Sequence, residues 1–235
     1  MITIVIPTYN EAQNIEKLIS LIFKVKLKEK VFLIFVDDNS PDGTGKMLDK
    51  LAKKHKGAIK VIHRKDERGL GSAYVRGFQE ALKTKASVIF GMDADLSHDP
   101  KYLPDFMKKI REGYDIVQGS RYMEGGGVNW SWHRIFISKS ANLFATTILG
   151  LDVHDVTGSY KAYKREVMKA LDIGSITSNG FSFFEEILYR AKLKGYKIGE
   201  TPIFFTDRKL GKSKLSKIEM FKFFVTIIRL RIFLR

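Results

Sequence analysis

Residues 1–24 read MITIVIPTYNEAQNIEKLISLIFK, and this stretch decides the fold class. Residues 2–6 are apolar or β-branched throughout and end at Pro7, so they predict a strand that is buried on both faces. Residues 11–24 place apolar side chains at helical spacing. These positions are Ile15, Leu18, Ile19 and Ile22. A buried strand followed by an amphipathic helix is typical of a parallel α/β sheet.

The same alternation continues to residue 92. Further strands are predicted at residues 31–36, 59–62 and 87–92, and helices at residues 44–55 and 72–82. Gly69 and Gly71 predict a tight turn before the second of these helices. Right-handed crossovers between such strands give a doubly wound sheet with helices on both faces.

The second half of the chain predicts another lobe of the same domain. A helix at residues 102–111 precedes a strand at 116–119, a glycine-rich loop at 125–127 and a long helix that ends at Leu149. Two strand-like runs, at residues 159–163 and 198–205, bracket a helix near residues 183–193.

The composition limits the kinds of metal site and of binding partner that the chain can have. The chain has 235 residues, of which 44% are apolar, enough for a sizeable core. With no cysteine, a bound metal is held by oxygen or imidazole, which favours Mg²⁺ or Mn²⁺. The formal net charge of +15 favours an anionic partner, namely nucleic acid, an acidic membrane or a phosphorylated substrate; the alternative is a solvated basic surface.

Neither end of the chain predicts a membrane span. The N-terminus lacks the basic segment and cleavage site of a signal peptide. No window reaches about 18 uncharged apolar residues. We therefore expect a cytoplasmic protein.

Carboxylates follow the predicted strands. Asp37 and Asp38 come after the second strand, and Asp93 and Asp95 come after the fourth. Ligands bind beyond the carboxyl ends of parallel strands, so we expect these side chains at one edge of the sheet. Two carboxylates two residues apart suit Mg²⁺, which commonly binds one or two carboxylates plus substrate phosphates. The alternatives are a strand-end turn for the second pair and a helix cap for the first.

Cations occur at informative places in the second half. Arg121 follows the fifth predicted strand, Arg134 and Lys139 lie near the start of the long helix, and Arg208 and Lys214 flank a glycine loop. Arginine forks suit phosphate oxygens, so several cations opposite a carboxylate-held metal predict a diphosphate site. For any single cation, ordinary surface charge is the alternative. The sequence contains no P-loop, nucleophile elbow or His-Glu-x-x-His motif.

The C-terminal segment, residues 216–235, predicts an interfacial amphipathic helix. One helical face collects Phe221, Phe224, Val225, Ile228 and Ile232. Cations interrupt or flank this face: Lys222, Arg229, Arg231 and Arg235. A basic, aromatic amphipathic helix is typical of the lipid headgroup region. The alternative is that this face packs on the domain core.

Ordered blocks of sequence carry a family resemblance. They lie at residues 6–11, 36–42, 92–98, 119–122, 155–159 and 208–214. With these blocks the chain resembles family-2 glycosyltransferases of the GT-A fold, and within them the dolichol-phosphate mannose synthases or polyprenyl-phosphate glycosyltransferases. The resemblance implies a Rossmann-like, mostly parallel α/β sheet with helices on both faces. It also implies one catalytic domain over residues 1–215, with a nucleotide-binding half at 1–97 and an acceptor and phosphate half at 98–215.

The resemblance assigns roles to residues of the nucleotide half. Positions that hold the nucleotide sugar are matched by Pro7, Tyr9, Glu11, Val36, Asp38, Asp93 and Ala94. Asp95 matches the direct ligand of the metal, Mg²⁺ or Mn²⁺. Ser97 stands where the family often has a second metal-proximal residue, glutamine.

In the acceptor half, the resemblance assigns roles mainly to cations. Arg121 matches a residue at the sugar-donor or acceptor phosphate, and Arg134 and Lys139 match residues that meet the acceptor phosphate. Arg121 and Arg134 join Asp95 as expected catalytic residues. Arg208 and Lys214 match a loop that closes over the diphosphate of the nucleotide sugar. A family carboxylate near the sugar is matched by Glu186.

The activity implied by the resemblance is inverting transfer of mannose from GDP-mannose to dolichyl or another polyprenyl monophosphate. The acceptor is largely dianionic at pH 7, because the second pKa of a phosphate monoester is about 6, so it attacks without a general base. The products are a β-linked lipid phosphomannose and GDP. The expected location is peripheral, on the cytoplasmic face of an anionic membrane, either alone or through a membrane-anchoring subunit.

Two other functions fit parts of the sequence. A polyprenyl-phosphate glucosyltransferase that uses UDP-glucose keeps the fold and the mechanism. A basic nucleic-acid-binding protein explains the charge but not the acidic strand ends, and no recognisable binding module is present, so we expect no nucleic-acid partner.

Overall fold

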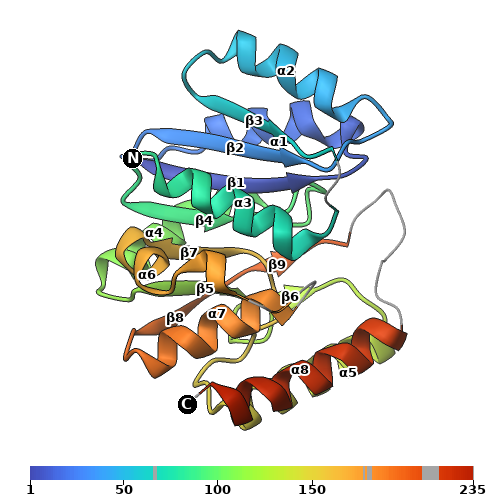
Figure 1. The fold of residues 1–235 in the computed structure, drawn as a ribbon, viewed down its shortest axis with the longest axis vertical. Helices are drawn as coiled ribbons and strands as arrows, with labels where there is room; N and C mark the ends of the chain where they lie inside the picture. Colours follow the sequence, from blue (N-terminus) through green and yellow to red (C-terminus); the bar gives the residue numbers. More distant parts are fainter. Residues whose placement is uncertain (66–67, 177, 179–181, 208–216, 235) are drawn as a thin grey trace.

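A computed structural model describes residues 1–65, 68–176, 178, 182–207 and 217–234 of the chain. Its centre is a sheet of seven strands in the order β3-β2-β1-β4-β7-β5-β8 (Figure 1). The strands are β1 (Ile2–Thr8), β2 (Val31–Asp37), β3 (Ile59–His63), β4 (Val88–Gly91), β5 (Ile116–Ser120), β7 (Lys161–Lys164) and β8 (Ile198–Pro202). The expected GT-A type of α/β fold is therefore confirmed.

The sheet is mostly parallel, as the sequence predicted. Strand β1 pairs in parallel with β2 and β4, and β5 pairs in parallel with β8. Strand β7 runs antiparallel between β4 and β5 and joins the two parallel groups. The strand-like run at 198–205 divides into β8 and the short β9 (Phe204–Phe205), which pairs with β6 (Gly127–Val128) in a separate two-stranded sheet.

Helices cover both faces of the sheet. The helices are α1 (Ala12–Lys24), α2 (Thr44–Lys54), α3 (Leu70–Leu82), α4 (Leu103–Arg111), α5 (Trp132–Leu149), α6 (Arg165–Ala170), α7 (Ser182–Leu193) and α8 (Lys217–Phe233). Two short 3₁₀ segments are η1 (Pro100–Tyr102) and η2 (Ile173–Ser175). The expected tight turn at residues 69–71 is shorter than predicted, because α3 already begins at Leu70. Gly69 alone adopts the left-handed backbone there, at φ +129°.

Two apolar clusters fill the space between sheet and helices. Alternate residues of β1 point to opposite faces, so Ile4 joins the cluster under α1 and α4 while Val5 joins the cluster under α3 and α7. Helix α3 lies close to β1 at Gly77, where a Cβ atom would approach Val5 Cγ1 to 2.2 Å. The continuous apolar strands of the sequence are therefore buried on both faces, as a covered parallel sheet requires.

The chain turns sharply beyond three neighbouring strands. Asn10 after β1, Asn39 after β2 and Leu96 after β4 all have positive φ, between 54° and 64°. Asparagine tolerates this conformation, whereas a leucine in it is an outlier. Strained backbone of this kind clusters at functional sites. The segment that holds Asp95 is therefore a candidate functional segment.

Helix α8 packs beside α5 and α7 and is apolar on two sides (Figure 1). Phe223, Ile227 and Leu230 are buried in the core under it. The face predicted from the sequence to be interfacial points away from the core, because all five of its apolar side chains are exposed. The alternative, that this face packs on the domain core, is therefore wrong, and a different side of the helix makes the core contacts. Among the described residues, no helix combines the length and apolarity needed to cross a bilayer.

Candidate active site

The carboxyl ends of β1, β2 and β4 meet at one edge of the sheet, as the parallel register requires. This edge brings together the loops that hold Pro7, Tyr9, Glu11, Asp38, Asp93 and Asp95. Tyr9 lies under the guanidinium of Arg68, 5.6 Å from its ring centroid. Val36 differs from the others because its side chain is fully buried in the core. A nucleotide contact of Val36 would therefore involve its backbone.

Asp38 is held in a buried two-point ion pair with Arg64 at the end of β3. Both distances from its carboxylate oxygens to Arg64 Nε and Nη2 are 2.7 Å. The Gly69 amide also donates to Asp38, at 3.1 Å. The helix cap suggested as an alternative is not made by Asp38: Gly43 is the N-cap residue of α2, and the carboxylate of Asp42 accepts from the amide and hydroxyl of Thr44.

Asp93 is fixed by three neighbours from different parts of the chain. The Tyr74 hydroxyl on α3 donates to its Oδ1 at 2.9 Å, and the Ser159 hydroxyl donates to its Oδ2 at 2.7 Å. The Asp93 amide donates to Nδ1 of His98 at 3.0 Å. Burial lowers the pKa of His98, so the ring stays neutral and its other nitrogen carries the hydrogen. Asp93 is thus positioned before any ligand arrives.

Asp95 has the chemistry of a metal ligand. The Ser97 amide and hydroxyl both donate to its Oδ1, the hydroxyl at 2.5 Å. Its second oxygen accepts no hydrogen bond from the described residues. No group of three or more His, Cys, Asp or Glu side chains that suits a metal occurs in the described ranges. This fits Mg²⁺ or Mn²⁺ held by one carboxylate with substrate phosphates supplying further oxygens.

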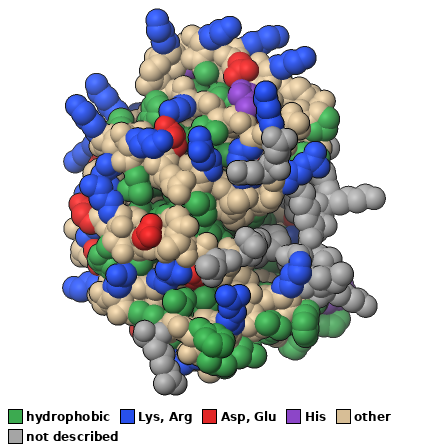
Figure 2. All heavy atoms as spheres, in the orientation of Figure 1, with side chains coloured by type: hydrophobic (Ala, Val, Ile, Leu, Met, Phe, Trp, Pro, Cys, Tyr) green, Lys and Arg blue, Asp and Glu red, His purple; other side chains and the backbone are tan. Residues whose placement is uncertain are grey.

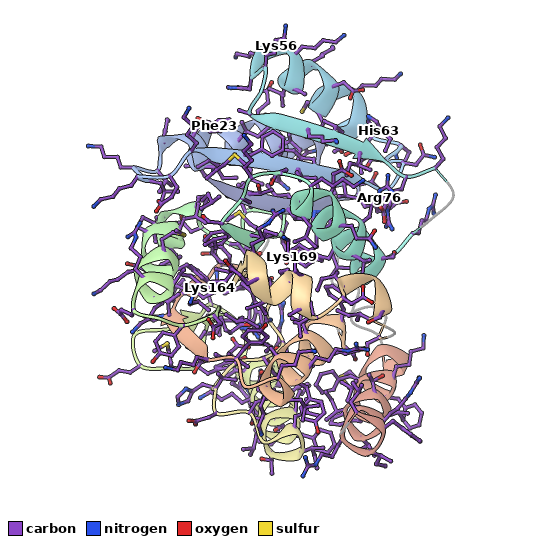
Figure 3. The ribbon with its side chains drawn as sticks, turned by 60° about the vertical axis from the view of Figure 1, so that its left-hand side comes forward. Phe23, Lys56, His63, Arg76, Lys164 and Lys169 are labelled. Carbon is purple, nitrogen blue, oxygen red and sulfur yellow. The ribbon has the colours of Figure 1, made fainter. Side chains whose placement is uncertain are left out.

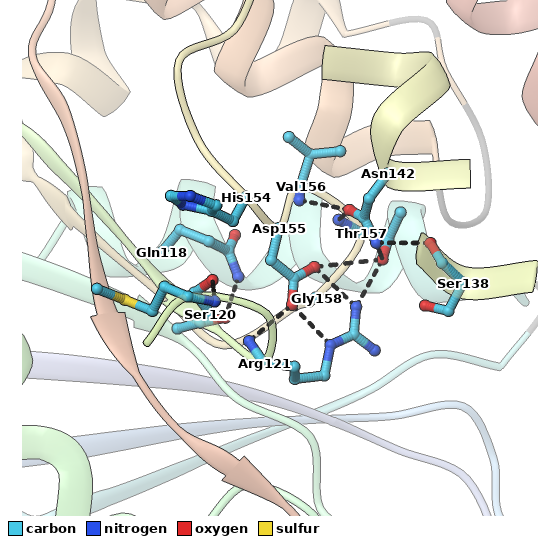
Figure 4. A network of polar contacts seen from close by, with 12 residues as sticks. Gln118, Ser120, Arg121, Ser138, Asn142, His154, Asp155, Val156, Thr157 and Gly158 are labelled. Carbon is cyan, nitrogen blue, oxygen red and sulfur yellow. Dashed lines mark hydrogen bonds and ion pairs between the residues drawn. The ribbon is translucent and has the colours of Figure 1, made fainter. Parts of the chain in front are cut away.

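Arg121 is buried at the end of β5 and forms an ion pair with Asp155 (Figure 4). Its Nε and Nη2 each lie 2.7 Å from an Asp155 oxygen, and Nη2 also donates to the Thr157 hydroxyl at 2.7 Å. Three aromatic rings surround the guanidinium at 5.2–5.7 Å: Tyr122, Trp130 and Phe205. Burial alone would lower the pKa of Arg121, but the charge and hydrogen bonds of Asp155 outweigh it and raise the pKa.

Asn142 ties helix α5 to the same loop (Figure 4). Its amide oxygen accepts from the backbone amide of Val156 at 2.8 Å, and its nitrogen donates to the carbonyl of Ser138 at 2.9 Å. These hydrogen bonds fix the position of helix α5 relative to the residues that hold Arg121.

The two other expected acceptor cations lie on α5, close to aromatic rings shared with Arg121. Arg134 stacks 3.9 Å from the Trp130 centroid and pairs with Asp207 at 2.6 Å. Lys139 is exposed and lies 5.7 Å from the centroid of Tyr122. All three cations thus surround one aromatic group next to α5.

Glu186 is buried on α7 and has close partners. Arg190 donates to its Oε1 at 2.7 Å, and the Ser178 amide donates to its Oε2 at 2.8 Å. These contacts link Glu186 to Ser178 and to the next turn of α7. The expected diphosphate residues Arg208 and Lys214 lie outside the described residues.

A buried lysine lies under the loop at residues 155–159. The Lys161 ammonium donates to the carbonyls of Val156, at 3.0 Å, and Gly158, and it lies 4.6 Å from the Phe184 centroid. Burial lowers the pKa of Lys161 to about 7. Burial also raises the pKa of Glu185, on α7, to about 8. The charge of Glu185 raises the pKa of Lys161, and the charge of Lys161 lowers the pKa of Glu185, so each group partly offsets the effect of burial on the other.

A cavity of about 490 Å³ lies on the outer side of α3. Its lining includes His63 and Arg76, which Figure 3 labels, as well as Arg64. None of the described residues expected to bind substrate lines it. The cavity therefore lies behind the candidate site, which it adjoins through Arg64.

Sequence reasoning missed the residues that support the site. Asp155, Thr157 and Ser159 lie in a block that carried the family resemblance, yet they were given no role. Arg64 and Lys161 looked like two of many surface cations. The apolar neighbours of Lys161 in the sequence were the one available signal that it lies in a buried strand.

A mostly parallel sheet with carboxylates at its carboxyl edge is the arrangement expected of a GT-A fold. The chain belongs to glycosyl transferase family 2, whose family model matches residues 3–172.

Two curated relatives cover most of the chain. A polyprenol monophosphomannose synthase of Mycolicibacterium smegmatis is 41% identical over 214 residues, which are 91% of this chain and 80% of that protein. An undecaprenyl-phosphate mannosyltransferase of Micrococcus luteus is 38% identical over 213 residues, which are 90% of this chain and 86% of that protein.

Solved structures share the fold at lower identity. A glucosyl-3-phosphoglycerate synthase of Mycobacterium tuberculosis, in complex with Mn²⁺, UDP and phosphoglyceric acid, has a TM-score of 0.69 and 20% identity. The alignment covers 98% of this chain and 78% of that one. The same enzyme with Mg²⁺ and UDP has a TM-score of 0.67 and 19% identity, with 98% and 79% covered.

Proposed function

We propose that the protein transfers mannose from GDP-mannose to a polyprenyl monophosphate such as dolichyl phosphate, with inversion, giving a β-linked lipid phosphomannose and GDP. The main observation in support of this proposal is that one loop contacts two groups of the candidate site. Ser159 contacts Asp93, the carboxylate expected to bind the nucleotide, and Asp155 contacts Arg121, the arginine expected to bind phosphate. These two groups therefore lie on either side of residues 155–159. The names of the two curated relatives support the same acceptor class and the same sugar.

The nucleotide half supplies binding and leaving-group stabilisation. Tyr9, Glu11, Asp38 and Asp93 surround the carboxyl edge, where a nucleotide in a doubly wound sheet binds. Asp95 would hold the metal ion, with Ser97 orienting its carboxylate. A bound Mg²⁺ or Mn²⁺ would stabilise the negative charge that develops on the leaving diphosphate.

The acceptor half supplies fixed positive charge. Arg121 is held by Asp155 and Thr157 and cannot rotate freely, so it is preorganised for a phosphate oxygen. Arg134 and Lys139 add two cations on the neighbouring helix. The acceptor phosphate is its own nucleophile, since it is already largely ionised at pH 7.

An apolar surface formed by α5 and α8 supports a membrane location. Phe144 of α5 and Phe224 of α8 touch at a centroid distance of 4.9 Å, so the two helices form one surface. Its exposed apolar side chains are Trp132, Phe136, Ile137, Leu143, Phe221, Phe224, Val225, Ile228, Ile232 and Phe233. In Figure 2 hydrophobic side chains gather at the lower end of the molecule, over these helices.

We infer that this surface enters the headgroup region of an anionic membrane, on its cytoplasmic face. Cations on the same two helices, Lys139 and Arg229, suit anionic lipid. Arg121 and Arg134 lie beside the first turns of α5, so an acceptor phosphate at the membrane surface would meet them with its lipid chain still in the bilayer. A membrane-anchoring subunit is the alternative occupant of this surface.

The deciding experiment is a lipid-product assay. The protein receives GDP-mannose or UDP-glucose with a polyprenyl monophosphate and Mn²⁺, and each reaction is repeated with EDTA. We expect EDTA-sensitive mannosyl lipid from GDP-mannose, with a β linkage by NMR. Product from UDP-glucose alone would change the donor and keep the mechanism. An α-linked product, or no lipid product from either donor, would contradict the proposal.

The nucleic-acid alternative has less support. Lys and Arg side chains are spread over the face shown in Figure 2, and the labelled cations Lys56, Arg76 and Lys169 of Figure 3 come from separate elements. A scattered distribution fits a solvated basic surface better than a single binding stripe. Salt-dependent binding of DNA or RNA would reverse this conclusion.

A further inference from the structure

One five-residue loop contacts both halves of the candidate site. Residues 155–159 lie in the connection between α5 and β7. Asp155 and Thr157 bond Arg121, while Ser159 bonds Asp93 at 2.7 Å. A displacement of this loop would therefore disturb the phosphate-binding arginine and the nucleotide-binding carboxylate together.

The loop rests on Lys161. The ammonium of this fully buried residue donates to the backbone carbonyls of Val156 and Gly158, one residue from each side of Thr157. A buried ammonium is costly unless it is paired and hydrogen-bonded, so its hydrogen bonds fix its position strongly. Lys161 thus anchors the backbone between the two contacts that face the site.

Glu185 is a buried acidic neighbour of this anchor. It is fully buried on α7, and it is the first of the acidic groups that favour the charged form of Lys161. Neither of its oxygens accepts a hydrogen bond from the described residues, and the nearby Tyr163 hydroxyl also lacks such a partner there. Gln118 stands opposite Lys161 in the pairing of β5 with β7 and is fully buried as well. Lys161 and Gln118 are therefore buried polar neighbours across the two strands.

Stability alone gives a poor reason for this arrangement. Replacing a buried charged pair by apolar side chains of similar volume is often neutral or stabilising. The surroundings of Lys161 include the ring of Phe184, which a methionine side chain would also contact. A residue that is costly to bury and contacts the loop backbone at two points is better explained by the geometry that it imposes.

We propose that Lys161 is a positioning residue for glycosyl transfer. It holds residues 155–159 so that Arg121 faces the acceptor phosphate while Asp93 faces the nucleotide. This inference rests on the proposed function, because it assigns the acceptor phosphate to Arg121.

The test compares Lys161→Met with Lys164→Met. Lys164 lies on the same strand and pairs with Asp115 at 2.9 Å, away from the loop. We expect Lys161→Met to remain folded at the assay temperature, with a melting temperature lowered by the loss of two buried hydrogen bonds. Its KM for polyprenyl phosphate should rise at least tenfold and its kcat should fall, while Lys164→Met stays within twofold of wild type in both. Glu185→Gln preserves volume and should show a smaller shift in the same direction.

A binding measurement separates this inference from the proposed reaction. The chain has two tryptophans, so Trp132→Phe leaves Trp130, which lies 5.2 Å from Arg121, as the fluorescent reporter. Titration with a short-chain prenyl monophosphate then reports acceptor binding without turnover. In this background Lys161→Met should weaken binding at least tenfold. Absence of lipid-linked product from the wild type would refute the proposed reaction, whereas this titration would still judge the role of Lys161.

A double-mutant cycle supplies the final criterion. If Lys161 acts through the loop, Asp155→Asn and Lys161→Met damage the same geometry, and the double variant is no worse than the more impaired single variant. Acceptor affinity and turnover within twofold of wild type in Lys161→Met would overturn the proposal. Additive losses in the double variant, or a parallel collapse of melting temperature and GDP binding in both Lys161→Met and Glu185→Gln, would overturn it as well.

Discussion

Asp155 holds Arg121 at two points, with 2.7 Å between each pair of bonded atoms, and it also accepts the Arg121 backbone amide at 3.0 Å. The carboxylate is fully buried, and the guanidinium nearly so. Burial alone would raise the pKa of Asp155, but the charge and hydrogen bonds of Arg121 outweigh it and lower the pKa. The pair is therefore ionised and oriented before substrate binds, as electrostatic catalysis requires.

Arg121→Lys should abolish this orientation while it keeps the positive charge. A lysine cannot make the forked contact, so we expect kcat/KM to fall about 100-fold or more. The buried Asp155 would lose its two-point partner, and the free energy of unfolding should fall by about 3 kcal/mol. Steady-state kinetics and urea denaturation measure both effects. Arg111→Lys, at a surface pair with Glu29, is the control and should change neither much. Activity of Arg121→Lys near that of wild type would refute the role of the fork.

Asp95→Asn should remove metal dependence together with activity. The amide is a poor ligand for Mg²⁺ or Mn²⁺, so we expect turnover to fall about 100-fold or more, by analogy with other lost electrostatic contacts. Metal affinity in the presence of GDP, measured by calorimetry, should fall in parallel. Asp99→Asn removes a nearby carboxylate that accepts from the Lys101 amide, and it should leave metal affinity unchanged.

Ser97→Ala tests how Ser97 acts. The hydroxyl donates to Asp95 at 2.5 Å, so we expect it to orient that ligand. Metal affinity should then fall about tenfold in Ser97→Ala. A loss as large as that of Asp95→Asn would instead identify Ser97 as a direct ligand.

Helix α8 should respond differently to changes on its two sides. Phe221 and Phe233 are 70% and 75% exposed, whereas Ile227 is fully buried. The double change of both phenylalanines to serine should reduce sedimentation with anionic vesicles at least tenfold and leave the melting temperature unchanged. Ile227→Ala should lower the free energy of unfolding by about 2–4 kcal/mol. Vesicle binding that survives the double change would disprove the membrane role of this face.

Glu185 should make stability depend on pH. Burial raises its pKa to about 8, so between about pH 4.5 and 8 the unfolded chain releases this proton and the folded protein keeps it. The folded state therefore loses relative stability as pH rises through this window. Lys161 and Arg121, whose charges lower this pKa, and Asp155, whose charge raises it, are the ionisable groups that act on Glu185.

Glu185→Gln removes that dependence. Relative to wild type, the variant should gain about 2–3 kcal/mol of unfolding free energy between pH 5.5 and 7.5, measured by urea denaturation at both values. A difference between the two proteins that stays constant with pH would show that Glu185 is ionised in the folded state.

Much of the fold followed from local patterns. Continuous apolar strands such as residues 2–6, each followed by an amphipathic helix, predict a covered parallel sheet. The carboxyl ends of such strands coincide, so the placement of Asp38, Asp93 and Asp95 at one edge needed no further information. The helix at residues 102–111 and the length of α5 also follow from periodicity.

The supporting contacts did not follow from local patterns. Asp155 and Arg121 are 34 residues apart, and Ser159 and Asp93 are 66 residues apart, with nothing in either segment to specify the partner. The antiparallel direction of β7 is likewise set by the strands on both sides of it. Glu186 was assigned to the sugar by resemblance, and this assignment stays a prediction; its contacts to Arg190 and Ser178 could not be read from the sequence.

The sequence by itself determined the α/β class, the edge of the sheet where ligands bind and the carboxylates that lie there, because strand and helix periodicity and the residues that end each strand are local properties. Only the tertiary structure decided that Lys161 is buried beneath residues 155–159, that Asp155 holds Arg121, and that α8 buries one apolar side while it leaves the other exposed. These features depend on which segments pack together, and burial changes the energy of a charge or an apolar side chain in a way that its position in the chain does not reveal.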